Sequence, residues 1–336
     1  MRPHTAVLLF NLGGPDDLRS VEPFLINLFS DREIIELPFG AAVQPGFARL
    51  IAKVRGPSVR RNYARIGGGS PQLRITRLQA AALETALNAA PAESLYRVFV
   101  AMRYTHPTAE AALEAIAESG IHRIVTLTLF PQYSKATTGS SRRAFERVLG
   151  KSFWRSLNFE VSHIDRYPGD PRYLDAMAAT VKAAWVRIPA ERRERAVILF
   201  SAHGLPQRFI DEGDPYVTDI ETTRKGLLDR LGLSNRELLA YQSRTGPVKW
   251  LGPGTEETLR ELGREGVRDV LVVPLSFVSD HIETLYEVDL LFADAAREAG
   301  ITGYYRSEAL NGSPLFIDAL AGLVRDHRDV PAGAVA

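Results

Sequence analysis

Short apolar runs alternate along the chain with segments of helical length, and this alternation restricts the fold more than any other feature. The apolar runs have the length of strands and read AVLLFN, YRVFVAM, RIVTLTLF, AVILFSA, ELLAYQS and DVLVVPLSF. Amphipathic stretches that suit helices include 108–119, 170–186, 255–265 and 283–299. Strands that alternate with helices form parallel βαβ units. We therefore predict an α/β protein with parallel sheets.

The order of these elements indicates an internal duplication. Each half of the chain supplies three predicted strands, and each strand ends in Gly, Pro and polar residues. A Pro/Gly cluster, IDRYPGDP, interrupts the pattern between the halves. We predict one domain over 1–166 and a second over 167–326, with its final helix packing on the first domain and a tail at 327–336. Ligands of open parallel sheets bind beside the carboxyl ends of the strands, where we expect the functional residues.

Composition excludes several classes of protein and site. Lys and Arg total 41 against 40 Asp and Glu, so no net field attracts nucleic acid. The sequence has no cysteine, which excludes disulfides, thiolate zinc sites and ordinary iron–sulfur ligation. It also lacks an apolar run of about twenty residues, the length that a spanning helix needs. We expect a cytoplasmic protein.

The segment 37–70 does not follow the strand–helix alternation. It mixes apolar residues with six basic residues and has no acidic ones. One interpretation is a helix-containing insertion with a solvated basic face. The other is an apolar, basic lip that suits an amphipathic acid or an anionic membrane surface.

A histidine and several carboxylates stand at predicted strand ends. His203 directly follows an apolar run, and it is either a hydrogen-bonded structural residue or a neutral imidazole that accepts a proton or binds a metal. Glu283 comes three residues after Asp280, a spacing typical of a capping box with Asp280 as N-cap. Glu287 follows one turn later on the same helical face. Like charges at this spacing destabilise a helix, so the face is either merely solvated or attracts cations and relays protons.

Aromatic and cationic residues near the same strand ends suggest a slot for a flat ligand. Each aromatic residue alone is more typical of packing, but together Tyr63, Tyr104, Phe130, Tyr133, Trp250 and Phe277 could line an apolar slot. Arg55, Arg65, Arg103 and Arg244 suit ligand carboxylates, or form surface ion pairs. In IGGGSP, Ser70 fits the N-cap of a helix that begins at Pro71.

The combination of motifs resembles the ferrochelatase family over nearly the whole chain. The resemblance rests on NLGGPDD, LFSDREIIELP, RRNYARIGGGSP, MRYTHP, FPQYSKATTGSS, SAHGLP, YQSRTGPVKWLGP and SDHIETLYEVD. Ferrochelatases insert ferrous iron into a porphyrin at the end of haem synthesis and release two protons. The resemblance implies two similar Rossmann-like domains with the porphyrin cleft between them. It also implies porphyrin and Fe²⁺ as substrates and no permanently bound cofactor.

The resemblance also assigns roles to individual residues. His203 matches a proton acceptor and metal ligand, and Glu283 matches a catalytic, metal-binding carboxylate that faces it across the macrocycle. His281 matches a catalytic residue in the hydrogen-bonded network that supports this carboxylate, and Arg103 and Tyr104 match a polar pair on the face opposite His203. The substrate-binding positions implied are Leu12, Arg55, Tyr63, Ser70, Arg103, Tyr104, Phe130, Trp250 and Phe277.

Departures from the family pattern refine these expectations. Lys135 stands where some relatives have a cysteine, so we expect no iron–sulfur cluster. The GGP turn and SAHGLP resemble the protoporphyrin IX branch more than the coproporphyrin branch, which stays an alternative. A non-catalytic porphyrin- or haem-binding protein and a cobalt-inserting enzyme are further alternatives. Expected partners are the inner membrane face, through 37–70, and the preceding oxidase of the pathway in a transient contact.

Overall fold

The computed structural model describes residues 4–34, 40, 42–89, 94–244 and 248–327, and it divides the chain into two units. The first unit runs to Tyr167 and resumes at Asn311, whereas the second is Pro168–Leu310. The predicted domain boundary, between residues 166 and 167, lies one residue before this division. The chain's last helix, α12 (Pro314–His327), belongs to the first unit. Positions 37–39 and 41 of the predicted lip and 328–336 of the predicted tail lie outside the described residues.

The first unit is built on a four-stranded parallel sheet of order β2-β1-β3-β4. Its strands are β1 (His4–Asn11), β2 (Leu95–Met102), β3 (Arg123–Thr128) and β4 (Glu160–Ile164). Besides α12, its helices are α1 (Val21–Ser30), α2 (Gln44–Arg65), α3 (Gln72–Asn88), α4 (Ala109–Glu118), the π-helix η1 (Lys135–Gly139), α5 (Ser140–Leu149) and α6 (Ser152–Ser156).

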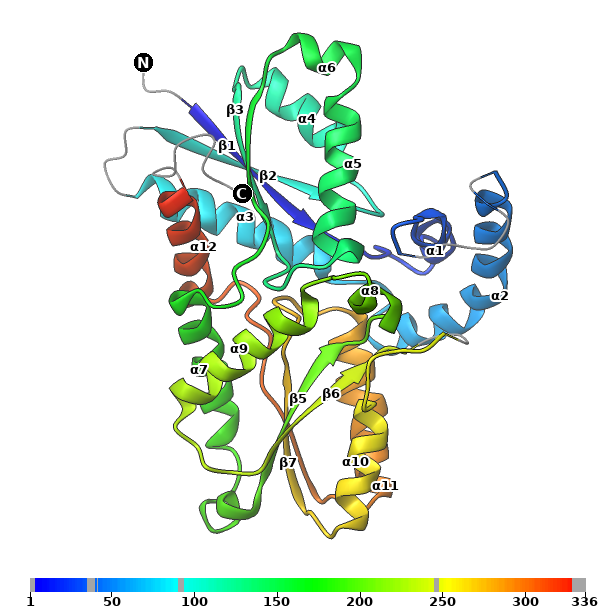
Figure 1. The fold of residues 1–336 in the computed structure, drawn as a ribbon, viewed down its shortest axis with the longest axis vertical. Coiled ribbons are helices and arrows are strands. Elements are labelled where there is room, and N and C mark those ends of the chain that lie inside the picture. Colours follow the sequence, from blue (N-terminus) through cyan, green and yellow to red (C-terminus); the bar gives the residue numbers. More distant parts are fainter. Residues whose placement is uncertain (1–3, 35–39, 41, 90–93, 245–247, 328–336) are drawn as a thin grey trace. The chain divides into compact units, whose positions relative to one another are not determined.

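Helices cover both faces of this sheet, which explains why its central strand reads as a continuous apolar run. Ala6 to Leu9 of β1 are fully buried. The helices α4 and α5 cover one face of the sheet (Figure 1). There Leu8 and Phe10 pack with residues such as Leu113 of α4 and Phe145 of α5. On the opposite face, α3 runs along the sheet, and α12 packs against α3.

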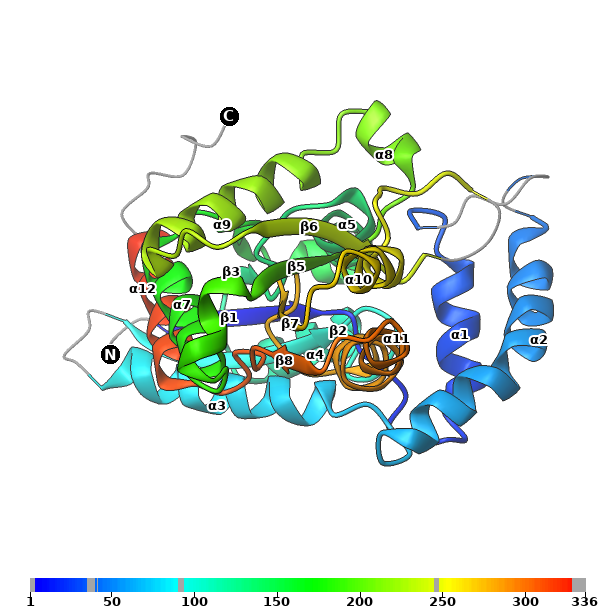
Figure 2. The same ribbon diagram turned by 90° about the horizontal axis from the view of Figure 1, so that it is seen from below.

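The second unit repeats this architecture with a parallel sheet of order β6-β5-β7-β8. Its strands are β5 (Val197–His203), β6 (Glu237–Gln242), β7 (Asp269–Pro274) and β8 (Gly303–Arg306). Its helices are α7 (Pro171–Trp185), the 3₁₀ helix η2 (Ala190–Arg195), α8 (Gln207–Asp211), α9 (Tyr216–Leu231), α10 (Thr255–Arg264), the π-helix η3 (Glu283–Phe292) and α11 (Ala293–Glu298). Figure 2 shows α10 and α11 side by side, and their residues Leu259 and Ala296 join Leu199 and Val272 of the sheet in one core.

The sequence analysis missed the fourth strand of each sheet. These strands, β4 and β8, have only five and four residues and lie at sheet edges. Most of their residues are partly exposed, so they lack the apolar run by which a buried strand is recognised. The six predicted strands and the repeated α/β pattern are confirmed.

The predicted helix at 283–299 forms as two elements, the π-helix η3 and the α-helix α11. The predicted N-cap at Asp280 is wrong, since Ile282 precedes η3 and no side chain caps it. Asp280 instead accepts hydrogen bonds from Thr284 Oγ1 and Arg306 Nη1. In the first unit, α3 begins at Gln72 rather than Pro71, although Ser70 Oγ accepts a bond from the Gln72 amide.

None of the described helices combines the length and the apolar composition that crossing a bilayer requires.

Candidate active site

His203 is the last residue of β5 and is anchored through its backbone. Its amide donates to Ser276 Oγ (2.8 Å), and its carbonyl accepts from the Tyr216 hydroxyl (3.0 Å). The next residue must be small, because a Cβ on Gly204 would lie 2.7 Å from the Gln242 carbonyl oxygen. The strand end thus places the imidazole at the carboxyl edge of the sheet, as predicted.

Glu283 is the first residue of η3 and lies directly beside His203. The distance from His203 Nδ1 to Glu283 Oε2 is 2.7 Å. The expectation that the two face each other across a macrocycle is wrong, because a hydrogen-bonded pair leaves no room for a ring between them. His203 and Glu283 instead form one continuous polar surface of the second unit.

A second carboxylate is tied to this pair by the residues that end β6. Ser243 Oγ donates to Glu283 Oε2 (3.1 Å) and to Glu287 Oε2 (2.7 Å). Gln242 Nε2 reaches Glu287 Oε2 (3.4 Å) and the Glu283 carbonyl (3.2 Å). Ser243 has a φ of 63°, a left-handed conformation that costs a non-glycine residue about 1–2 kcal/mol. Such strain concentrates at functional sites.

Electrostatics separate the protonation states of these three groups. Burial disfavours a charged His203, but the Glu283 carboxylate outweighs it and raises the pKa of the imidazole. Burial likewise opposes ionisation of Glu283, but His203 lowers the pKa of this carboxyl to about 2. Burial and the charge of Glu283 raise the pKa of Glu287 to about 7. Glu287 is therefore the carboxyl of this cluster that titrates near neutral pH.

His281 bonds to residues of its own segment of the chain. Its Nδ1 lies 3.0 Å from the Ser279 carbonyl oxygen, which can only accept, so this nitrogen carries a proton. Among the described residues His281 bonds to Ser279 and Thr284 and not directly to Glu283, so its place in the network that supports this carboxylate stays a prediction. The Phe277 ring packs between the two histidines, with centroids 4.7 Å from His281 and 6.3 Å from His203. Burial lowers the pKa of His281, so it packs as a neutral ring.

Trp250 is brought to the same strand end by pairing between two loops. It forms a β-bridge with Pro206, and the Leu251 amide donates to the Leu205 carbonyl (2.9 Å). A Cβ on Gly204 would lie 3.6 Å from the Trp250 ring. The second unit therefore gathers Trp250, Phe277, His203 and Glu283, four of its five predicted site residues, around the end of β5.

The first unit holds a polar cluster around one buried carboxylate, Asp31. This carboxylate accepts bonds from Arg103 Nη2 (2.8 Å), the Tyr104 hydroxyl (2.6 Å) and Ser140 Oγ (2.5 Å). Burial raises its pKa, but the hydrogen bonds and the Arg103 charge outweigh burial and lower it. Tyr104 is only 2% exposed. The predicted pair Arg103 and Tyr104 is thus held together by a residue that the sequence analysis did not select.

The other predicted residues of the first unit fall at separate places. Tyr63 and Ser70 meet at Gly14, where a Cβ would lie 2.6 Å from the Ser70 side chain and 3.6 Å from the Tyr63 hydroxyl. Arg55 stacks over Phe29 at 5.8 Å. Leu12 and Phe130, both partly buried, follow the ends of β1 and β3.

The residues that sequence reasoning missed are the hydrogen-bonding partners of those it chose. They are Asp31, Ser140, Gln242, Ser243 and Tyr216. Asp31, Ser140 and Ser243 stand inside motifs that carried the resemblance, LFSDREIIELP, TTGSS and YQSRTGP. Their position inside these motifs could therefore have identified them as site residues. Nothing else in the sequence distinguishes a serine or aspartate that bonds to a site residue from one on the surface.

Comparison with known proteins identifies the family. The ferrochelatase family model matches residues 4–328. The chain is 50% identical over 330 residues to the ferrochelatase of Geotalea uraniireducens strain Rf4, covering 98% of this chain and 99% of that relative. The chain belongs to the ferrochelatase family. A Synechocystis ferrochelatase is 46% identical over 97% of this chain and 83% of its own length. The predicted resemblance is confirmed, and it places this ferrochelatase-family chain among lyases that act as porphyrin metal chelatases.

Solved structures support the fold of this family member. SirB from Bacillus subtilis, solved with Fe³⁺, superposes with a TM-score of 0.55 at 13% identity, covering 96% of this chain and 95% of SirB. A sirohydrochlorin chelatase SirB in complex with cobalt gives a TM-score of 0.54 over 98% of both chains. The predicted fold of two similar Rossmann-like units with parallel sheets is confirmed.

Proposed function

We propose that the chain inserts Fe²⁺ into protoporphyrin IX and releases two protons, the terminal step of haem synthesis. The hydrogen bond between His203 Nδ1 and Glu283 Oε2 carries this proposal, because it joins a base to a carboxylate at the edge of the sheet. Membership of the ferrochelatase family supports the reaction class. The GGP turn and SAHGLP support protoporphyrin as the porphyrin.

In this mechanism His203 accepts a pyrrole proton at Nε2, the ring nitrogen opposite its bond to Glu283. The nearby carboxylate stabilises the imidazolium that forms, as a carboxylate does in catalytic triads. The charge of the arriving iron disfavours the imidazolium, so His203 begins each proton transfer in its neutral form. Glu287, with a pKa of about 7 and joined to Glu283 through Ser243, can take up the proton next and pass it to solvent.

The same pair would hold iron before the proton transfer, because His203 Nε2 cannot bind iron and accept a proton at the same time. Imidazole nitrogen and carboxylate oxygen both suit Fe²⁺, so thiolate ligands are not needed. Among the described residues, no group of three or more His, Asp or Glu side chains is arranged to hold a metal ion. A two-ligand site fits a substrate ion that must leave for the porphyrin.

Apolar and cationic groups would bind the macrocycle. Phe277 and Trp250 flank His203 and offer a surface for a flat ring. We assign Arg55 and Arg103 to the porphyrin propionates, because a guanidinium matches a carboxylate in geometry and charge. Binding energy from the whole ring can then favour the distorted porphyrin that exposes its inner nitrogens.

An anaerobic insertion assay with Fe²⁺ tests the proposal. Protoporphyrin IX and coproporphyrin III are incubated side by side, and conversion is followed in the porphyrin absorption spectrum. We expect metal insertion, faster with protoporphyrin, and slower by about 10²–10⁴-fold or more with the His203→Ala variant. Faster insertion into coproporphyrin III would show that coproporphyrin, rather than protoporphyrin IX, is the substrate, and the proposed iron-insertion reaction would stand. Tight haem binding without insertion of iron into either porphyrin would identify a non-catalytic binding protein instead.

We also propose that the protein contacts a membrane surface through α2. This helix and the residue before it, Val43, expose four apolar residues at spacings of four, three and four, which lie along one helical face. They are Val43, Phe47, Leu50 and Val54, exposed by 40%, 37%, 57% and 71%. The basic residues Arg49 and Lys53 lie beside them. Such a face suits shallow insertion into an anionic bilayer.

Co-sedimentation with phosphatidylglycerol and phosphatidylcholine vesicles tests this contact. We expect binding to the anionic vesicles, and its loss in a Leu50→Gln, Val54→Gln double variant. Leu78→Gln, a change at an exposed apolar residue of α3, is the matched control. Equal sedimentation of the double variant and the wild type would contradict the proposal.

The absence of cysteine from the sequence supports a further proposal, that the protein binds no iron–sulfur cluster. Lys135, which begins η1, occupies the position of the cluster cysteine in some relatives. Iron analysis of protein purified anaerobically should find no stoichiometric iron or sulfide. Sulfide and iron in fixed ratio to protein would contradict this.

A further inference from the structure

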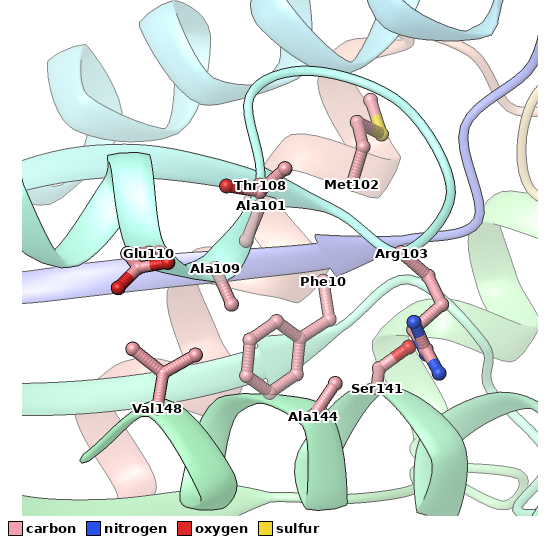
Figure 3. Close-up of a pocket in the computed structure, with 10 residues that line it drawn as sticks. All are labelled: Phe10, Ala101, Met102, Arg103, Thr108, Ala109, Glu110, Ser141, Ala144 and Val148. Carbon is pink, nitrogen blue, oxygen red and sulfur yellow. The ribbon is translucent and has the colours of Figure 1, made fainter. Parts of the chain in front are cut away.

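A cavity of about 240 Å³ lies within the first unit, beside the carboxyl end of its sheet. Its walls come from the ends of β1 and β2, the start of α4 and one side of α5 (Figure 3). It is smaller than the 300–1,000 Å³ that is usual for drug-sized ligands, so it does not suit a porphyrin.

Apolar side chains form most of the cavity surface. The apolar residues that line it are Phe10, Ala101, Met102, Ala109, Ala144 and Val148. Figure 3 shows Phe10 at the centre, with Val148 and Ala144 of α5 on one side of it and Ala109 of α4 on the other. An apolar wall of this kind favours a hydrocarbon body over water.

One polar group in this wall has no partner. Ser141, on α5, is 5% exposed, and its hydroxyl makes no hydrogen bond within the described structure. A buried hydroxyl without a partner costs about 1–3 kcal/mol. Arg103 lines the same cavity (Figure 3). A ligand that bonds to Ser141 Oγ would remove the cost.

The remaining polar groups at the cavity favour a negative charge near Ser141. Arg103 uses Nε and Nη2 on Ser140 and Asp31, which leaves three of its five N–H donors without a bond to the described residues. The ten-residue helix α4 begins here, with its N-cap at Thr108 and the positive end of its dipole. Glu110 also lines the cavity, but its carboxylate pairs with Lys151 Nζ at 2.6 Å.

From this arrangement we propose that the cavity binds a small carboxylic acid with an apolar body, such as a monocyclic aromatic carboxylate. The ring lies against Phe10, Ala109 and Val148, and the carboxylate accepts bonds from Ser141 and Arg103. Arg103 is shared with the proposed porphyrin site, but binding here needs neither iron nor porphyrin, so this proposal and the proposed function can fail separately.

Fluorine NMR of the full chain, without iron or porphyrin, tests the proposal with two probes of similar shape. Fluorobenzoate should bind, and fluorobenzyl alcohol should bind about tenfold more weakly, because hydrogen bonds to a charged group are stronger than those to a neutral one. Loss of one such bond in Ser141→Ala should weaken fluorobenzoate about tenfold. Ala144→Leu should abolish binding by filling the cavity.

The matched control is Ser156→Ala, which changes an exposed serine of α6 away from the cavity and should leave binding unchanged. If Ala144→Leu does not fold, Ser141→Ala still decides the result. The proposal is overturned if fluorobenzoate does not bind at millimolar concentration, if the two probes bind equally, or if Ser141→Ala binds fluorobenzoate like the wild type.

Discussion

The two units share one strand order but place different chemistry at equivalent strand ends. In each sheet the second strand of the order is flanked on both sides, and it ends in Asn11 in the first unit and His203 in the second. Asn11 is 2% exposed and bonds to Thr76 and Gln72 of α3. His203 instead pairs with Glu283. The same position thus serves structure in one unit and proton chemistry in the other.

The neighbouring strand ends show the same division. Arg103 follows β2, and Ser243 occupies the equivalent position after β6. In the first unit this position supplies a cation to one buried carboxylate, whereas in the second it supplies a hydroxyl to two carboxylates. The scaffold fixes where side chains gather, and residue identity decides what they do.

We expect the largest loss of activity when His203, the residue that ends β5, is replaced. His203→Asn installs the residue that ends β1, and His203→Ala removes the side chain. Both should lower kcat by at least about 10²–10⁴, the usual contribution of a general base. Anaerobic turnover measures this, with thermal unfolding as the check on folding. Turnover within a few-fold of wild type in either variant would remove His203 from the proposed role.

Glu283→Gln should have the next largest effect. The amide cannot stabilise an imidazolium by charge, so we expect kcat to fall about 10²-fold, towards the lower end of what general catalysis supplies. The pKa of His203 should also fall, because the charge that raises it is gone. Proton NMR of the imidazole would detect this shift. An unchanged histidine titration would show that the 2.7 Å contact does not control its protonation.

Asp31→Asn tests the cluster of the first unit. Breaking a buried ion pair on one side costs about 3 kcal/mol, so the free energy of unfolding should fall by that order at neutral pH. Activity should be lost mainly through a higher KM, because Arg103 is proposed to bind substrate rather than to transfer protons. Steady-state kinetics and urea unfolding measure the two effects. A fall in kcat with KM unchanged would contradict the proposed division between the units.

The pH dependence of the same variant follows from the sign of the shift. The folded state lowers the pKa of Asp31 below its ordinary value of 3.8. Its stabilising effect is therefore complete above that value and is lost as the pH falls through the folded pKa. The difference in stability between wild type and Asp31→Asn should shrink below about pH 4, which acid unfolding would show.

Glu287→Gln should have the smallest effect. The pKa of this carboxyl is raised from 4.5 to about 7, so the folded state binds a proton over that range and the unfolded state does not. Wild-type stability should therefore fall between these pH values by more than that of the variant. Turnover should drop a few-fold, and any inflection of kcat near pH 7 should disappear. Parallel pH profiles of both proteins would contradict a proton-carrying role.

Much of the fold could be predicted because short stretches of sequence are enough to recognise the buried strands and the helices. Buried parallel strands such as β1 and β7 read as unbroken apolar runs, and both were recognised. The strands β4 and β8 were not, because edge strands pair on one side only and need no apolar run. The π-helical form of η3 was also missed, since helical periodicity does not distinguish i→i+5 from i→i+4 bonding over ten residues.

The sequence by itself determined the family, the α/β class and the placing of His203 at the end of a strand, with Glu283 in the segment that follows the apolar run DVLVVPLSF. Those properties depend on short motifs and on the periodicity of apolar residues, both of which can be recognised from the order of residues in the chain. Only the tertiary structure decided that the two residues touch, that Ser243 joins Glu283 to Glu287, and that Asp31 orders Arg103 and Tyr104. Such contacts join residues 40 to 80 positions apart, and their distances depend on how the sheets and helices pack.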